Sequence, residues 1–87
     1  MNFYKLEWKK SAVKELKPLP KNYISEIIKT VERLSLTPFP PGIKKLSSSK
    51  RTYRIRVGMY RIIYEVFEEK LMINIVRIRH RKDVYKK

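Results

Sequence analysis

Apolar residues recur three and four positions apart from Lys21 to about Leu36, which is the spacing of one buried face of an α-helix. The apolar positions of this stretch are Tyr23, Ile24, Ile27, Ile28, Val31 and Leu34. Before it, SAVKELKPLP predicts a shorter helix with Ser11 as its N-cap, which Pro18 and Pro20 end or bend. The opening NFYKLEW alternates like a strand, with Phe3 and either Leu6 or Trp8 facing a core.

The second half of the chain changes to the alternation of β-strands, which we predict near residues 52–57, 60–67 and 70–79. The intervening TPFPPGIKKLSSSKR holds three prolines and a glycine and is predicted to be a connection. The order is therefore strand, helix, helix and three strands. It predicts one α+β domain over 1–87, in which the helices cover one face of a mainly antiparallel sheet.

Gly58-Met59 predicts a type II′ turn, because the first position of that turn requires a positive φ. This turn would place Val57 opposite Tyr60 and Arg56 opposite Arg61. One face of the hairpin would then be apolar and aromatic. The other face would carry Arg54, Arg56, Arg61 and Ile63.

Like charges directly opposed on paired strands are unfavourable, by an amount comparable to the roughly 0.2–1 kcal/mol that good cross-strand pairs contribute. Folding alone gives no reason to place Arg56 opposite Arg61. A bound anion would remove the repulsion, whereas the alternative is that both side chains extend into solvent with Glu65 nearby.

The third strand most simply pairs Val66 with Leu71 and Ile62 with Ile75. In that register Ile78 lies on the arginine face with His80 beyond it, and Arg77 lies near the end of the apolar face. A one-residue bulge would exchange these positions, so the facing of Arg77 and Arg79 stays open.

Charge then narrows the class of partner. The chain has 22 Lys and Arg against 8 Asp and Glu, a net charge of +14, which favours polyanions such as nucleic acid, although a generally lysine-rich surface is the alternative. Seven of the eight arginines lie between positions 51 and 81. Arginine binds phosphate through its planar fork, so this half is the candidate binding region.

The chain has no cysteine, no apolar run long enough to span a membrane and no apolar signal-peptide core, so we expect a cytoplasmic protein. It also has no glycine-rich phosphate loop, no carboxylate cluster for a metal and no recognisable Ser, His and Asp motif. No cofactor is expected. The remaining chemistry is metal-free transesterification of RNA, in which positive charge stabilises the transition state and nearby groups move protons.

Three residues are candidates for proton transfer. His80 is the only histidine, and histidine ordinarily titrates near neutrality. Tyr85 could donate a proton or stack on a base, and Lys82 could donate a proton. Each is also consistent with an ordinary surface residue.

YRIRVGMYRIIYEV (53–66) followed by INIVRIRHRKDVY (73–85) resembles the two most characteristic segments of the RelE/ParE toxin superfamily, close to its RelE-type branch. The resemblance extends over nearly the whole chain. It implies a small ribosome-dependent endoribonuclease that cuts messenger RNA in the ribosomal A site and is held inactive by an antitoxin wrapped around it.

On the motif positions that match, the resemblance implies the site residues Arg54, Arg56, Arg61, Arg81 and Tyr85. With His80, which is added because histidine titrates near neutrality, they make up the predicted catalytic set. Arg54 and Arg56 depart from the lysines of the best-known member and are too basic to exchange protons readily. We expect five further basic residues to contact RNA: Lys44, Lys45, Arg77, Arg79 and Lys82. The expected partners are the ribosome with its mRNA and an acidic RelB-like antitoxin, with which a heterotetramer could form, and no membrane.

Two other functions fit the same sequence. One is a ParE-like toxin that binds DNA gyrase and cuts no RNA. The other is a non-catalytic RNA-binding module, whose affinity would fall steeply with salt but which would show no cleavage.

Overall fold

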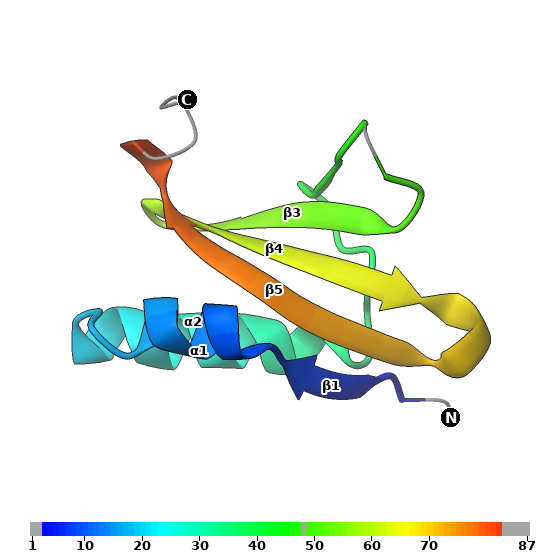
Figure 1. Cartoon of the computed structure of the whole chain (residues 1–87), viewed down its shortest axis with the longest axis horizontal. Helices are drawn as coiled ribbons and strands as arrows, with labels where there is room; N and C mark the ends of the chain where they lie inside the picture. Colours follow the sequence, from blue (N-terminus) through cyan, green and yellow to red (C-terminus); the bar gives the residue numbers. More distant parts are fainter. Residues whose placement is uncertain (1–2, 48, 83–87) are drawn as a thin grey trace.

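The computed structural model describes residues 3–47 and 49–82. A five-stranded sheet with strand order β1-β5-β4-β3-β2 packs against two helices (Figure 1). The elements are β1 (Lys5–Trp8), α1 (Lys10–Leu16), α2 (Lys21–Leu34), β2 (Lys44–Lys45), β3 (Thr52–Val57), β4 (Tyr60–Phe67), the 3-10 turn η1 (Glu68–Lys70) and β5 (Met72–His80). All neighbouring strands are antiparallel except β1 and β5, which are parallel. The predicted α+β fold is confirmed.

The core lies between α2 and the helix-facing side of the sheet. From α2 it receives Ile27, Val31 and Leu34, as the three- and four-residue spacing predicts. From the sheet it receives Val57, Ile62, Tyr64, Val66, Ile73, Ile75 and Ile78. Each fully buried side chain of this kind contributes roughly 1.5–3 kcal/mol relative to exposure, so the alternation of the strands fixes which side of the sheet faces the helices.

Two predictions for the N-terminal part were wrong. Phe3 is 59% exposed, and the residues that pack against the core here are Tyr4, just before β1, and Leu6 and Trp8 within it. Ser11 is not an N-cap, because α1 begins at Lys10 and has no side-chain cap. Its hydroxyl points away from α1 and donates a hydrogen bond to a backbone carbonyl of β5.

The β3–β4 hairpin has the predicted register in full, from Val57 opposite Tyr60 to Tyr53 opposite Tyr64. Gly58 has a φ of +59°, and among the described non-glycine residues only Leu71 has a positive φ, so Met59 follows with a negative φ as in a type II′ turn. The local turn therefore determines which hairpin residues share a face.

The register predicted for β5 was wrong. Val66 lies opposite Ile73 rather than Leu71, a difference of two residues. The pairing then shifts by one more residue, because Tyr64 faces Ile75 while its neighbour Ile63 faces Arg77. Val76 is thus an extra residue that forms a β-bulge. The bulge reverses the side of the sheet that each side chain in the second half of β5 faces.

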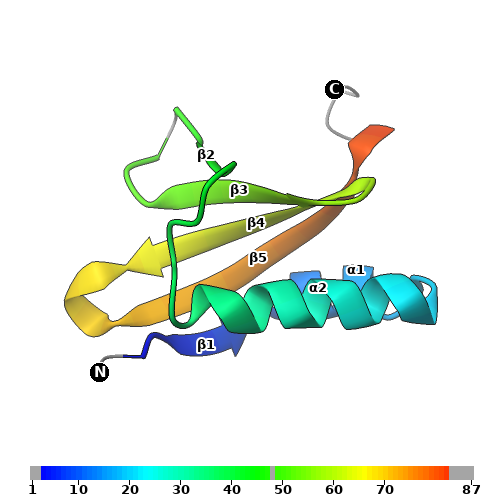
Figure 2. The same ribbon diagram turned by 180° about the vertical axis from the view of Figure 1, so that it is seen from behind.

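The segment between α2 and β3 is more than a connection. Lys44 and Lys45 form the edge strand β2, which the proline-rich sequence did not predict, and Figure 2 shows the chain passing the other strands to reach this edge. Tyr64 donates a hydrogen bond of 2.9 Å from its hydroxyl to the Pro38 carbonyl, which ties this segment to the core. Burial, together with the neighbouring Tyr53, raises the pKa of Tyr64 well above its ordinary value.

Candidate nucleic-acid interface

Basic side chains form two rows across the face of the sheet opposite the helices, which we call the outer face. In the first row, Arg56, Arg61 and Arg79 lie directly opposite one another on β3, β4 and β5. In the second row, Lys44 lies opposite Arg54. Since adjacent strands are only about 4.8 Å apart, the first row places three like charges side by side.

A polar cavity of about 190 Å³ lies between these rows and is lined by Gly42, Lys44, Arg54, Arg56 and Arg61. It can hold several water molecules, each of which occupies about 30 Å³ in the liquid, or a small anion in their place. Arg61 is half-buried and its Nη1 is covered, whereas Arg56 is exposed. A ligand in this cavity would therefore meet one partly buried guanidinium, that of Arg61, and one exposed guanidinium, that of Arg56.

The hairpin turn orients two of the predicted site residues. Arg56 Nε donates to the Gly58 carbonyl over 3.1 Å, and the backbone N–H of Arg81 donates to the Met59 carbonyl over 2.6 Å. The turn thus directs one guanidinium of the first row and fixes the chain just after β5. Arg81 itself is exposed beside the turn.

Glu65 does not relieve the repulsion within the first row, as the sequence had allowed. It lies opposite Thr52 and Asn74, four residues along β4 from Arg61, which is about 13 Å at 3.3 Å per residue. Its carboxylate lies 4.0 Å from Lys9 Nζ. The opposed arginines are consequently the feature that an anion would stabilise most.

Arg77 and Arg79, whose facing the sequence left open, both lie on the outer face of the sheet. Arg79 completes the first row, and Arg77 lies opposite Ile63 at the edge of the outer face. Arg77 Nη1 is 3.2 Å from Glu15 Oε2, so this guanidinium is paired with a carboxylate of α1. The simplest register placed Arg77 near the end of the apolar face, and the one-residue bulge, which the sequence left open as the alternative, reverses that facing.

His80 was predicted beyond the arginine face, and the structure corrects this. Its partner in the register is Tyr60, which packs against the core, and the two rings meet edge to face with centroids 5.3 Å apart. Its Nδ1 accepts the backbone N–H of Lys82 over 3.1 Å. The neutral ring therefore carries its proton on Nε2, where it is a donor.

Two further predicted residues, Lys45 and Lys82, lie apart from the two rows. Lys45 lies opposite Tyr53, so it points to the other side of the sheet from Lys44. Lys82 lines a separate cavity of about 390 Å³ with Met59, His80 and Arg81. Tyr85 lies outside the described residues.

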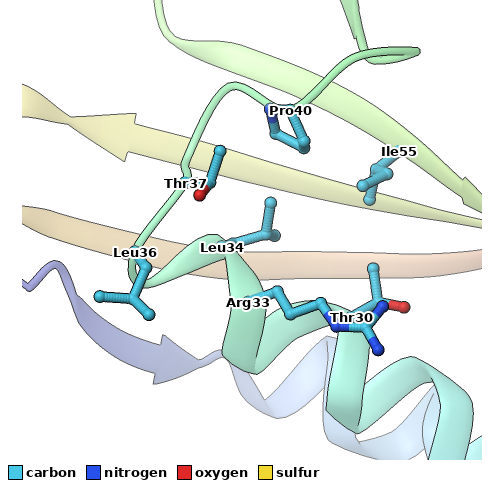
Figure 3. Close-up of a pocket in the computed structure, with 7 residues that line it drawn as sticks. All are labelled: Thr30, Arg33, Leu34, Leu36, Thr37, Pro40 and Ile55. Carbon is cyan, nitrogen blue, oxygen red and sulfur yellow. The ribbon is translucent and has the colours of Figure 1, made fainter.

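Another cavity, mostly apolar and of about 340 Å³, lies between α2 and β3 (Figure 3). Its lining residues are Thr30, Arg33, Leu34, Leu36, Thr37, Pro40 and Ile55. Figure 3 shows the Arg33 side chain running along α2 toward Thr30. With one guanidinium and no acid or histidine in its lining, this cavity has the chemistry of a packing surface and not of a catalytic one.

Two residues of the interface were not recognised from the sequence. Gly42 lines the polar cavity with a φ of +89°, and the Pro-Pro-Gly before β2 was the signal that a sharp turn brings Lys44 to the sheet. Glu15 holds Arg77 from a helix far away in the chain, and no local pattern indicates that contact.

The described residues can supply positive charge but few proton-transfer groups. Guanidinium groups bind the oxygens of a phosphate in pairs and stabilise charge that develops on them, but they do not exchange protons near neutrality. No group of three or more His, Cys, Asp or Glu side chains placed to bind a metal occurs within 3–47 and 49–82. In the same part of the chain, neither helix has the length and apolar character needed to cross a membrane.

Known proteins are similar to this chain in sequence and in fold. Residues 6–85 match the family described as ParE toxin of type II toxin-antitoxin system, parDE. Toxin RelE3 of Methanocaldococcus jannaschii is 35% identical over 85 residues, which cover 93% of this chain and 94% of that protein. A chain of the crystal structure of the archaeal RelE–RelB complex from Pyrococcus horikoshii superposes with a TM-score of 0.82 at 30% identity, covering 91% of this chain and 96% of the other.

A further likeness is found in the crystal structure of a RelB–RelE antitoxin–toxin complex from Methanococcus jannaschii. Its matching chain is 33% identical, with a TM-score of 0.74 and coverage of 91% of this chain and 94% of that one. The similarity thus extends over most of the chain, from residue 6 to residue 85 in the family match.

Proposed function

The chain belongs to the RelE/ParE toxin family of type II toxin–antitoxin systems, and on this premise we propose that it is a ribosome-dependent endoribonuclease of the RelE type. It would cut mRNA in the ribosomal A site and thereby stop translation. The observation that carries the proposal is the row of Arg56, Arg61 and Arg79 beside a polar cavity. Three opposed cations destabilise a sheet, and a bound phosphate turns that arrangement into a favourable one.

In the proposed reaction the 2′-hydroxyl of one nucleotide attacks the adjacent phosphorus. The new P–O bond closes a 2′,3′-cyclic phosphate as the bond to the 5′-oxygen breaks. A base takes the proton of the 2′-hydroxyl, and an acid returns a proton to the leaving 5′-oxygen. Arg56, Arg61 and Arg54 would bind the non-bridging oxygens, where negative charge increases in the transition state.

Proton transfer is assigned to the end of β5 and the residues that follow it. The Nδ1 of neutral His80 accepts the Lys82 N–H, so the neutral ring offers the RNA only a hydrogen bond from Nε2, and His80 would serve as the acid in its imidazolium form. Tyr85 and Lys82 are the other candidates, and Arg81 would hold the phosphate beside the turn. His80 starts on the side of the sheet that faces the helices, so its participation requires the RNA to pass around the end of the hairpin.

We expect an acidic RelB-like antitoxin as the regulatory partner. The related crystal structures named above are complexes of RelE with RelB. A net charge of +14, with two basic rows on the outer face, gives an acidic chain a surface to neutralise. Co-purification of this chain with an acidic product of the same operon tests the proposal, and its size would show whether two copies of each chain assemble.

The decisive experiment is mRNA cleavage on programmed ribosomes, read by toeprinting. Cleavage by the wild-type protein should fall by about 10²–10³ in Arg61→Ala, which is the usual effect of removing one group that stabilises transition-state charge. Arg81→Ala tests the second phosphate contact. Arg33→Ala removes the one arginine outside the 51–81 region and should retain activity. Intact A-site mRNA in the presence of folded wild-type protein would refute the proposal.

The family description names ParE, so inhibition of DNA gyrase is the second candidate. A supercoiling assay separates the two, because a gyrase-directed toxin should block supercoiling and leave mRNA intact. An RNA-binding module without catalysis would lose affinity as salt rises, yet show no cleavage.

A further inference from the structure

The bulge at Val76 determines which residues of β5 reach the outer face. Before the bulge, Ile73 and Ile75 are buried in the core; after it, the buried residue is Ile78. In a regular strand with period two, the residues after Ile75 that face the core would be 77 and 79. Without the bulge, Arg79 would leave the first row for the apolar side.

The backbone of β5 shows the same reversal. The carbonyls of Leu71 and Ile75, four residues apart, accept hydrogen bonds from the backbone N–H groups of Lys5 and Lys9 at the β1 side. Val76 directly follows Ile75, and its carbonyl also points to this side. Consecutive carbonyls of a regular strand point to opposite edges, so this pair of contacts is specific to the bulged strand.

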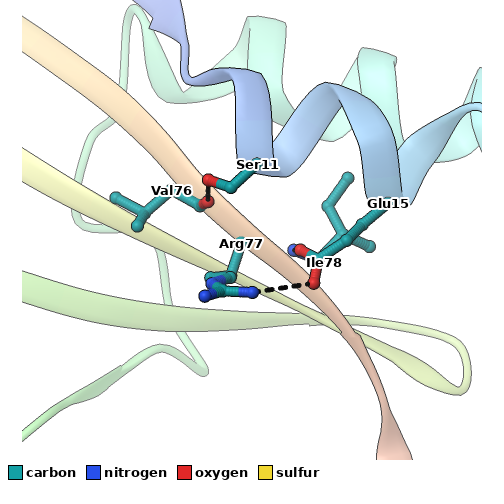
Figure 4. A network of polar contacts seen from close by, with 5 residues as sticks. All are labelled: Ser11, Glu15, Val76, Arg77 and Ile78. Carbon is teal, nitrogen blue, oxygen red and sulfur yellow. Dashed lines mark hydrogen bonds and ion pairs between the residues drawn. The ribbon is translucent and has the colours of Figure 1, made fainter.

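Helix α1 supplies partners for the groups that the bulge exposes (Figure 4). The Ser11 hydroxyl donates to the Val76 carbonyl over 2.7 Å, and Glu15 Oε1 accepts the Ile78 backbone N–H over 2.8 Å. Glu15 Oε2 accepts from Arg77 Nη1 over 3.2 Å. Ser11 and Glu15 lie four residues apart in the helix and therefore on the same side of it.

The need for these partners follows from the length of β1. Its pairing with β5 ends at Trp8 opposite Ile75, so the edge of β5 beyond that point is not covered by a strand. Backbone groups at a sheet edge need hydrogen-bond partners or solvent. Because of the bulge, the backbone groups that point to this edge belong to residues 76 and 78 instead of residue 77. Ser11 and Glu15 form their hydrogen bonds with these groups.

We infer that Ser11 and Glu15 are positioning residues that hold β5 in its bulged register and thereby keep Arg79 in the row with Arg56 and Arg61. The consequence for RNA rests on the proposed function, whereas the register itself does not. The part of Glu15 that matters is its acceptance of the Ile78 N–H, because its half-exposed ion pair with Arg77 adds little.

Thiol accessibility tests the register directly, because the sequence has no cysteine. Ile78→Cys introduces one thiol after the bulge at a position that is 4% exposed, and Ile75→Cys introduces one before it at a position that is 0% exposed. Each is labelled in the otherwise unchanged protein and in the Ser11→Ala/Glu15→Ala double variant. Loss of both hydrogen bonds should accelerate labelling of the thiol at 78 by about 10- to 100-fold, at up to roughly tenfold for each bond, and leave the thiol at 75 protected.

Unchanged protection at 78 overturns the inference. Equal acceleration at 75 and 78 also overturns it, because the two residues would then support the fold as a whole. Glu15→Gln keeps an oxygen that can accept the Ile78 N–H and should keep the thiol at 78 protected, whereas Glu15→Ala should not.

Salt dependence of binding to single-stranded RNA connects the register to function. In the double variant without introduced cysteines, the slope of log affinity against log salt should fall by about 0.7 for the loss of the Arg79 contact. Altered labelling at 78 with an unchanged slope would support the positioning role and count against the proposed RNA contact of Arg79. Failure of the positioning role and failure of the proposed function therefore give different results.

Discussion

The repulsion within the first row predicts that the protein becomes more stable when one of its charges is removed. Arg56→Gln is the suitable change, since Arg56 is exposed and loses little packing. It removes one of the two like-charge neighbours of Arg61. Opposed charges on paired strands cost a few tenths of a kcal/mol, so we expect a gain of about 0.2–0.5 kcal/mol and a rise in Tm of about 1–4 °C for a domain of this size.

Thermal unfolding at low and high ionic strength measures this effect. The Debye length is about 30 Å at 0.01 M salt and about 3 Å at 1 M, so the stabilisation should be present in the first condition and nearly absent in the second. Lys45→Gln is the matched control, because it also lowers the net charge by one but lies opposite Tyr53 and not opposite a cation.

Addition of a short RNA should reverse the order of stability. The wild-type protein carries the complete row and should gain more Tm from the RNA than Arg56→Gln does. If Arg56→Gln is no more stable than Lys45→Gln at low salt, the opposed arginines do not repel one another measurably, and the reason for assigning the row to an anion is lost.

Three further results are expected. Arg61→Ala should lower mRNA cleavage on programmed ribosomes by about 10²–10³. Tyr64→Phe removes the hydroxyl that donates to Pro38 and should lower the free energy of unfolding by about 1 kcal/mol in urea denaturation. Because burial raises the pKa of Tyr64, the folded state favours its neutral hydroxyl. The stability that Tyr64 adds is therefore complete below the ordinary pKa of 10.0 and falls as the pH rises further. The difference in the free energy of unfolding between wild type and Tyr64→Phe should narrow above pH 10.0. Gly58→Ala should destabilise the fold by about 1–2 kcal/mol, since the position has a φ of +59° and a new Cβ would lie 3.1 Å from Tyr23 Cε1; an unchanged denaturation midpoint would contradict the turn assignment.

The helix and the hairpin were predictable because short-range features determine them. The spacing of apolar residues between Lys21 and Leu34 gives α2 directly. Gly58 fixes the turn, and the turn fixes the pairing of every residue in the hairpin, including Arg56 opposite Arg61.

The sequence did not predict strand β2 at the edge of the sheet. Strand β2 has only two residues and follows a proline-rich segment, so its pairing depends on the exposed edge of β3 and not on its own pattern. That pairing brings Lys44 next to Arg54 and closes the polar cavity with Gly42. Lys44 and Lys45 look equivalent in the sequence, yet only Lys44 lines the cavity.

By itself, the sequence determined the α+β class, the apolar face of the hairpin and the concentration of arginine in the second half, because periodicity, turn chemistry and composition are properties of neighbouring residues. Tertiary structure decided the register of β5, which places Arg79 in the first row and His80 beside Tyr60. The physical reason is the bulge at Val76, whose backbone is held by Ser11 from 65 residues away. A contact over that separation leaves no periodic signal in the sequence, and a shift of one residue exchanges the two faces of a strand.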